Sequence, residues 1–127
     1  MLYNKIASRP SMYKNMKRLP LSFIQFNDIE KNKNLHIYNG ICKGQTSTYY
    51  DFKIQVKDPP LNLNSDIKVY CSCESFKYQF QALLFRNNGL LTEYEISKIM
   101  IQRPKKIKSL YVCKHLEVAL IKLLKRS

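Results

Sequence analysis

The chain has 127 residues and a formal net charge of +13; the length suits one domain, and the charge predicts contact with a polyanion or with acidic protein neighbours. Its apolar runs are far too short for a membrane-spanning helix and its N-terminus lacks the apolar stretch of a secretory signal, so we expect a soluble intracellular protein with no membrane partner. The four cysteines of such a protein are expected to be thiols or metal ligands, because disulfides are rare inside cells.

Positive charge is concentrated at the two ends of the chain. Residues 1–20 hold five Lys or Arg and no acid, and residues 103–127 hold eight with a single acid, Glu117. These ends are expected to contact nucleic acid or acidic proteins; the alternative is a solvated, solubilising surface. The candidate contact residues are Lys5, Arg9, Lys14, Lys17, Arg18, Arg103, Lys105, Lys106 and Lys108.

Residues 1–30 are predicted to form a basic N-terminal arm, and residues 31–127 a single domain. Pro10 and Pro20 leave room in the arm for at most one short helix, near residues 11–17. The apolar residues that follow Pro20 must pack on the domain or on a partner.

Three segments alternate between apolar and polar residues with the period of two that is typical of strands: 35–42, 47–57 and 67–72. A turn at Lys43-Gly44-Gln45 joins the first two, and Pro59-Pro60 ends the second, since proline cannot donate to a strand ladder. We therefore expect a small antiparallel three-stranded sheet.

Helical spacing of apolar residues follows the third strand. It predicts a helix over residues 75–86, ended by Asn87-Asn88-Gly89. A second helix, over 93–101, follows a capping-box pattern, and a third, over 113–125, carries a broad apolar stripe. The fold class is therefore α+β.

Two separate residue pairs have the chemistry of metal ligands. Cys71 and Cys73 lie two apart at the end of a strand, so their side chains point to the same side. Cys113 and His115 begin the last helix, where the helix dipole stabilises a thiolate. Three thiolates and one imidazole complete the tetrahedral shell of Zn²⁺, which predicts a structural zinc site with no position for a small-molecule substrate.

Two other uses of these residue types stay open. The alternative for Cys71 and Cys73 is a redox pair that binds no metal. Cys42 and His36 share a face of the first strand and are candidates for a second metal site, although ordinary packing is the favoured interpretation because no further Cys or His remains to complete a shell.

The Cys-x-Cys pair and the run Cys113-Lys114-His115-Leu116 resemble the SWIM-type zinc finger, here with 39 residues between Cys73 and Cys113. This long insertion, with Phe76-Lys77-Tyr78-Gln79-Phe80 and Arg103-Pro104, is similar to small proteins of large tailed bacteriophages. The resemblance covers about residues 35–124. It implies a zinc-binding virion component whose partners are other virion proteins.

Features of an enzyme are missing from the sequence. It has no paired carboxylates at a readable spacing, no glycine-rich phosphate loop and only three glycines. We therefore expect a non-enzymatic, zinc-stabilised structural or assembly protein, located in the virion and the host cytoplasm, that contacts neighbouring subunits and DNA. The alternative is a stand-alone SWIM-type module that binds nucleic acid or acts in regulation.

Overall fold

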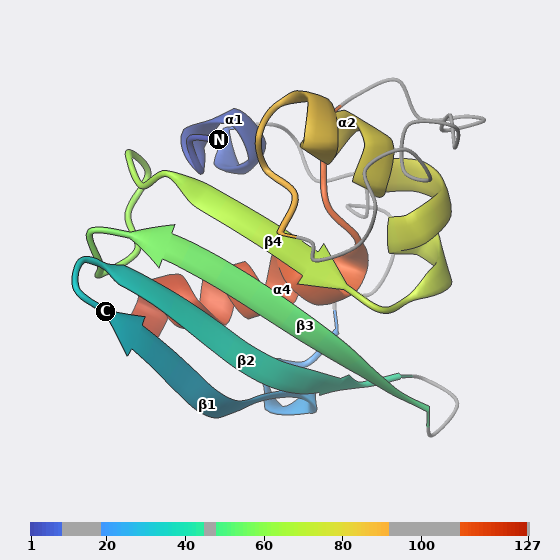
Figure 1. The fold of residues 1–127 in the computed structure, drawn as a ribbon. Coiled ribbons are helices and arrows are strands. Elements are labelled where there is room, and N and C mark those ends of the chain that lie inside the picture. The colour runs from blue at the N-terminus through green and yellow to red at the C-terminus, as the bar shows by residue number, and fades with distance from the viewer. Residues whose placement is uncertain (9–18, 45–47, 92–109, 127) are drawn as a thin grey trace.

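The structure is a computed structural model that describes residues 1–8, 19–44, 48–91 and 110–126. It has the expected α+β class, with an antiparallel sheet crossed on one face by the last helix (Figure 1). The described elements, in chain order, are α1 (Asn4–Ala7), η1 (Leu21–Phe23), β1 (Ile24–Asn32), β2 (Leu35–Lys43), β3 (Tyr49–Lys57), β4 (Ile67–Cys71), η2 (Phe76–Phe80), α2 (Gln81–Arg86) and α4 (Lys114–Arg126).

The sheet has four strands in the order β1-β2-β3-β4, so the prediction of three strands was wrong. The three expected segments are present as β2, β3 and β4, and each strand pairs antiparallel with the next. Their alternation has the predicted physical cause, because Phe52, Ile54 and Val56 of β3 are all buried on one face of the sheet.

The strand missing from the prediction is β1. It begins within the predicted basic arm, residues 1–30, and continues past residue 30 into the predicted domain. Its register shifts between Phe26 and Asp28, and this bulge breaks the period of two. The turn that joins β1 to β2 contains Lys33 at a φ of 52°, a position where glycine or asparagine is the usual signal. Regular alternation in β1 and a glycine or asparagine at the first turn position, the two sequence signals for a hairpin, are therefore both absent.

Gly40 lies directly opposite the bulge and is required by two aromatic rings. Phe26 on β1 and Phe52 on β3 both pair with Gly40 and meet edge to face above it, with ring centroids 5.5 Å apart. A Cβ atom on Gly40 would collide with the ring of Phe52 and with the carbonyl oxygen of Gln25. The missing side chain therefore lets the two rings pack together.

The outer edge of β4 is covered by backbone from two distant segments. The amide of Ile67 donates to the Met1 carbonyl at 2.7 Å, and the amide of Val69 donates to the Gly89 carbonyl at 2.8 Å. The amino group of Met1 also forms an ion pair with Asp66. These contacts leave little of the β4 edge free to pair with another chain.

The helix predicted over residues 75–86 is present, but its first part is π-helical. The amide of Gln81 donates to the carbonyl of Phe76, five residues earlier. The expected stop is confirmed: Asn88 takes the left-handed conformation with a φ of 58°, and the Gly89 amide donates to the Leu84 carbonyl at 2.7 Å. This pattern is a Schellman motif.

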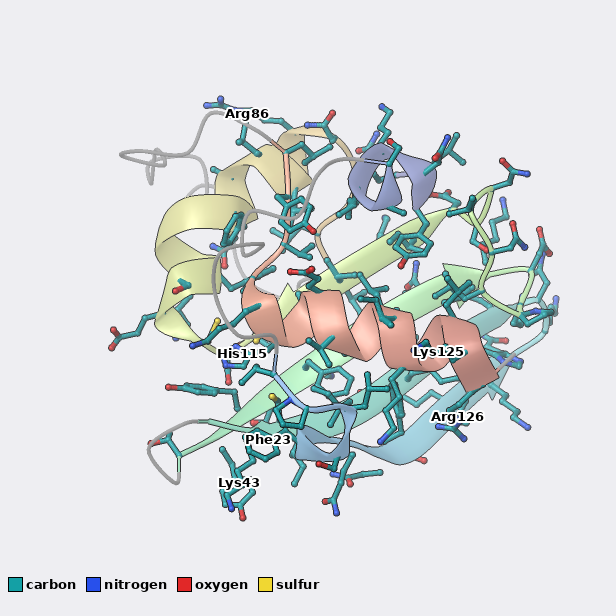
Figure 2. All side chains as sticks on the ribbon, turned by 180° about the vertical axis from the view of Figure 1, so that it is seen from behind. Phe23, Lys43, Arg86, His115, Lys125 and Arg126 are labelled. Carbon is teal, nitrogen blue, oxygen red and sulfur yellow. The ribbon has the colours of Figure 1, made fainter. Side chains whose placement is uncertain are left out.

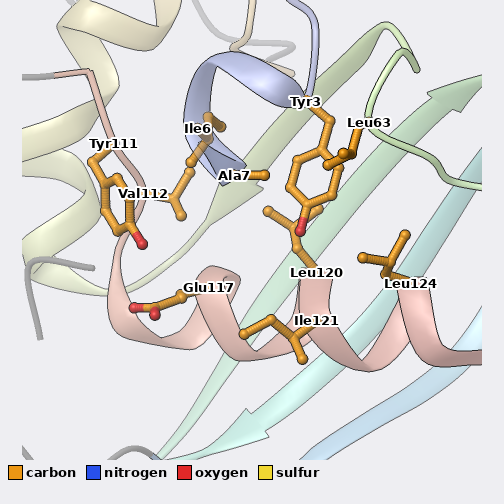
Figure 3. Close-up of a pocket in the computed structure, with 10 residues that line it drawn as sticks. All are labelled: Tyr3, Ile6, Ala7, Leu63, Tyr111, Val112, Glu117, Leu120, Ile121 and Leu124. Atoms are coloured by element: carbon orange, nitrogen blue, oxygen red, sulfur yellow. The ribbon is translucent and has the colours of Figure 1, made fainter. Parts of the chain in front are cut away.

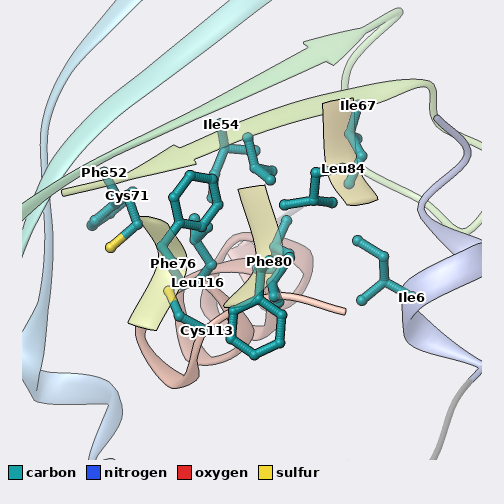
Figure 4. Packing of buried hydrophobic residues seen from close by; sticks show 14 of the residues in the cluster. Ile6, Phe52, Ile54, Ile67, Cys71, Phe76, Phe80, Leu84, Cys113 and Leu116 are labelled. Atoms are coloured by element: carbon teal, nitrogen blue, oxygen red, sulfur yellow. The ribbon is translucent and has the colours of Figure 1, made fainter. Parts of the chain in front are cut away.

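The last helix, α4, agrees with the prediction for residues 113–125 and packs against β1, β4 and η1. Its apolar stripe joins the core that Figure 4 shows between the sheet and the helices, where Leu116 lies near Phe76 and Phe80. The ammonium of Lys122 donates to the carbonyls of Leu21 and Ile24, at 3.2 and 2.6 Å.

Two predicted helices, near residues 11–17 and over 93–101, lie outside the described residues. Among the helices that the structure describes, none has the length and apolar character needed to cross a membrane.

Replacement of Gly40 by alanine should destabilise the protein by about 1–3 kcal/mol, because the added methyl group must displace Phe52 or the β1 backbone. The measurement is the free energy of unfolding in denaturant. Asn39→Ala is the matched control, since Asn39 lies next to Gly40 with its side chain directed to the other face, where it donates to Glu30. Equal stability of Gly40→Ala and the wild type would contradict the packing described for the two rings.

Candidate metal centre

The four predicted ligands come from the end of β4 and the start of α4. Cys71 is the last residue of β4, and Cys73 follows two residues later. Cys113 directly precedes α4 and its carbonyl accepts the amide of Glu117 at 3.0 Å, which is the bonding of a helix N-cap. His115 lies in the first turn. The sulfur atoms of Cys71 and Cys113 point into the same part of the core (Figure 4).

The structure brings all four residues together. Their ligand atoms lie within 4.8 Å of one another, and all four side chains are buried. A tetrahedral Zn²⁺ ion with bonds of about 2.3 Å to sulfur holds its ligand atoms about 3.8 Å apart. The cluster therefore has the dimensions and the donor atoms of a metal site, as the spacing of the two pairs predicted.

An unpaired nitrogen indicates that the cluster suits an ion. Nδ1 of His115 is buried and has no hydrogen-bond partner among the described residues. A buried polar atom without a partner is destabilising, whereas a metal ion uses an imidazole lone pair directly. The ring of Tyr50 packs on the imidazole with centroids 4.8 Å apart and restricts its orientation.

The three cysteine side chains can all ionise to thiolates only beside a positive charge. Cys71, Cys73 and Cys113 are free and form no disulfide. Hydrogen bonds from the Cys113 and Cys71 thiols lower the pKa of Cys73, while burial raises the pKa of Cys113. The amide of Phe76 also donates to the sulfur of Cys73, at 3.4 Å. One thiolate is thus stabilised by its neighbours, and ionisation of all three requires a bound cation.

The neighbouring candidates have different surroundings. Cys42 is buried outside the four-residue cluster, and burial, together with nearby Cys73, raises its pKa to about 11. His36 and Cys42 pair with Val56 and Tyr50, six positions apart along the sheet. At about 3.3 Å per residue this separates them by roughly 20 Å, so they cannot share one ion. The idea of a second metal site made by these two residues is therefore wrong.

Of the nine basic residues predicted to contact partners, only Lys5 lies within the described chain, where it is exposed on α1. The other eight, from Arg9 to Arg18 and from Arg103 to Lys108, fall outside it. Sequence reasoning missed the role of Tyr50. Its alternation with Phe52 indicates the buried face of β3, but only the docking of α4 shows that it meets His115.

A separate cavity of about 350 Å³ lies between α1 and α4 (Figure 3). Its walls are mostly apolar, and its polar side chains are Tyr3, Tyr111 and Glu117. Burial raises the pKa of Tyr3, and the nearby Tyr111 and Glu117 raise it further. The neutral phenol is therefore the form of Tyr3 that the fold favours.

Comparison of the chain with protein-family models, with curated proteins and with solved structures found no match. The cluster is compatible with a zinc finger. The resemblance to SWIM-type zinc fingers and to phage proteins rests on the sequence motif alone.

Removal of the metal should unfold the C-terminal half of the domain, because the free energy of binding at a structural zinc site, on the order of 10 kcal/mol, is coupled to folding. The purified protein should contain one zinc per chain by elemental analysis. Addition of a chelator, or the change Cys113→Ser, should sharply lower the helical circular dichroism signal and the melting temperature.

Cys42→Ser is the matched control, since Cys42 is equally buried but lies outside the cluster. It should keep stoichiometric zinc even if it loses some packing energy. A wild-type protein without metal that ignores chelator would refute the zinc site.

Alkaline pH should test the surroundings of Tyr3. Because its pKa is higher in the folded protein than the ordinary value of 10.0, its contribution to stability is complete below pH 10 and is lost as the pH rises above that value. The Tyr3→Phe variant has no phenol to ionise at this position. As the pH rises above 10, its melting temperature should therefore fall less than that of the wild type. Tyr49→Phe, at an exposed ring, should follow the wild type.

Proposed function

We propose that the protein is a non-enzymatic structural protein, stabilised by zinc, that contacts neighbouring subunits in the virion of a tailed bacteriophage. The observation that carries this proposal is the composition of the metal centre: four protein side chains, all buried, supply a full tetrahedral set of ligands. An ion held in this way has no open position for water or substrate, so its role is to stabilise the fold.

The distribution of charge supports contact with several neighbours. Exposed basic side chains lie on different sides of the domain, among them Lys43, Arg86, Lys125 and Arg126 (Figure 2). Two of them are held near aromatic rings: the ammonium of Lys43 is 5.8 Å from the ring centre of Phe23, and the guanidinium of Arg126 is 5.1 Å from that of Phe26. A scattered positive surface suits an environment with acidic neighbours or DNA on more than one side.

The place in a virion is supported by the sequence resemblance. It depends on the long insertion between Cys73 and Cys113 and on the motifs within and around it. The alternative is a free SWIM-type module that binds nucleic acid, which the net charge of +13 favours.

Mass spectrometry of purified phage particles tests the proposal. The protein should be present at a fixed copy number per particle and should stay with the particle after washing at high salt. A protein found only in the soluble lysate would refute the virion assignment.

Binding to double-stranded DNA tests the alternative. A free module should bind as a monomer, with an affinity that falls steeply as the salt concentration rises. Neutralisation of Arg103, Lys105, Lys106 and Lys108 to glutamine should weaken binding and reduce the salt slope, because each lost phosphate contact releases one counterion fewer. Lys77→Gln with Arg86→Gln is the control, since both residues are exposed and lie outside the predicted contact regions.

A further inference from the structure

The face of the sheet opposite α4 is uncovered over β1, β2 and β3 by any helix that the structure describes (Figure 1). Side chains that alternate with the buried Phe52 and Ile54 point to this face, and directly paired residues on neighbouring strands share it. We call it the outer face. Its residues are Gln25, Asp28, Glu30 and Asn32 on β1, Leu35, Ile37, Asn39, Ile41 and Lys43 on β2, and Tyr49, Asp51, Lys53, Gln55 and Lys57 on β3.

The outer face changes in character from strand to strand. β1 contributes the acids Asp28 and Glu30, and β3 contributes Lys53 and Lys57. β2 contributes the half-buried aliphatic side chains of Leu35, Ile37 and Ile41, with Asn39 between the two isoleucines and Lys43 at the end of the strand. The apolar row of β2, with Ile37 near its centre, thus lies between an acidic strand and a strand with more lysine than acid.

An acid on β1 and a lysine on β3 also lie at the same height along the strands. Asp28 pairs with Asn39, and Asn39 pairs with Lys53, so the acid and the lysine lie at the same height on either side of β2. Within the part of the chain that the structure describes, neither Asp28 nor Lys53 has an ion-pair partner. With β1 and β3 each about 4.8 Å from β2, the acid and the lysine are placed symmetrically about the apolar row.

We propose that the outer face binds a second copy of this chain, in a two-fold dimer whose axis runs along β2. Rotation by half a turn about this axis lays β1 of one copy over β3 of the other while residue heights are kept. Asp28 of each copy then faces Lys53 of its partner, and the two rows of isoleucine pack on each other. The strands of the two sheets lie nearly parallel, which is the common aligned packing of β-sandwiches.

Among the other pairs created by this rotation there is one like-charge pair: Lys43, at the end of β2 on the axis, meets Lys43 of the second copy, and the two Asp28–Lys53 pairs outnumber it. Glu30 faces Gln55, Asp51 faces Gln25, and Lys57 faces Asn32 across the interface, as the register within the sheet requires. A rotation about an axis across the strands would instead bring β1 onto β1 and place acid against acid. Charge complementarity therefore selects one of the two arrangements.

The size of the face sets the strength of the dimer. Three strands of nine residues cover about 30 Å by 15 Å, or roughly 450 Å² per copy, below the about 800 Å² of a stable interface. The net charge of each copy also opposes association, although salt screens this repulsion beyond about 8 Å at physiological ionic strength. The dimer is thus weak and reversible in dilute solution. It does not depend on the proposed virion role.

Sedimentation equilibrium of the zinc-bound, full-length protein at physiological ionic strength tests the proposal. The wild type should show a concentration-dependent monomer–dimer equilibrium. Asp28→Lys and Lys53→Glu should each weaken it at least about tenfold, since each places two like-charge pairs in the interface. The double variant, and an equimolar mixture of the two single variants, should both recover association, because each restores opposite charges.

Arg86→Glu is the matched control, with the same change of charge as Lys53→Glu at an exposed site away from the outer face, and should dimerise like the wild type. All variants should keep their zinc content and melting temperature. The proposal is overturned if the wild type is monomeric up to its solubility limit, or if the mixed variants do not associate. It is equally overturned if Lys53→Glu abolishes DNA binding of a monomer, since the face would then bind nucleic acid.

Discussion

Three thiols and one imidazole converge in a region of the core that excludes water, and the rest of the structure depends on how their charge is balanced. Their hydrogen bonds to one another stabilise only one thiolate. A divalent cation bound there would offset two of the three thiolate charges and would join the end of β4 to the start of α4 by direct bonds. Since α4 also packs against β1 and η1, this link would fix the helix that covers one face of the sheet.

Other contacts hold the same layers together without a metal. Lys122 reaches from α4 to the backbone that leads into β1, and Phe26 and Phe52 close the sheet over Gly40. At the opposite edge, Met1 and Gly89 hydrogen-bond to the backbone of β4. The sheet is therefore supported at both edges and on one face, and the metal centre lies where β4 and α4 meet.

Much of this arrangement could be predicted from the sequence. Residues two apart share a side in a strand, which identified Cys71 and Cys73, and the apolar stripe identified α4. β1 could not be recognised, because a bulge after Phe26 breaks its alternation and Lys33 occupies a turn position that usually holds glycine. The contact of Tyr50 with His115 joins residues from different elements, and no local pattern encodes it.

The distance along the chain between the two ligand pairs has a consequence for how the protein can change. An ion bound to Cys73 and Cys113 closes a loop of 39 residues, and the entropy of loop closure depends only on the logarithm of loop length. Doubling the insertion would reduce stability by only about 0.6 kcal/mol. Residues added to this segment outside η2, α2 and the Gly89 contact with β4 should therefore have little thermodynamic effect, whereas loss of Phe76, Phe80 or Leu84 would remove packing from the core.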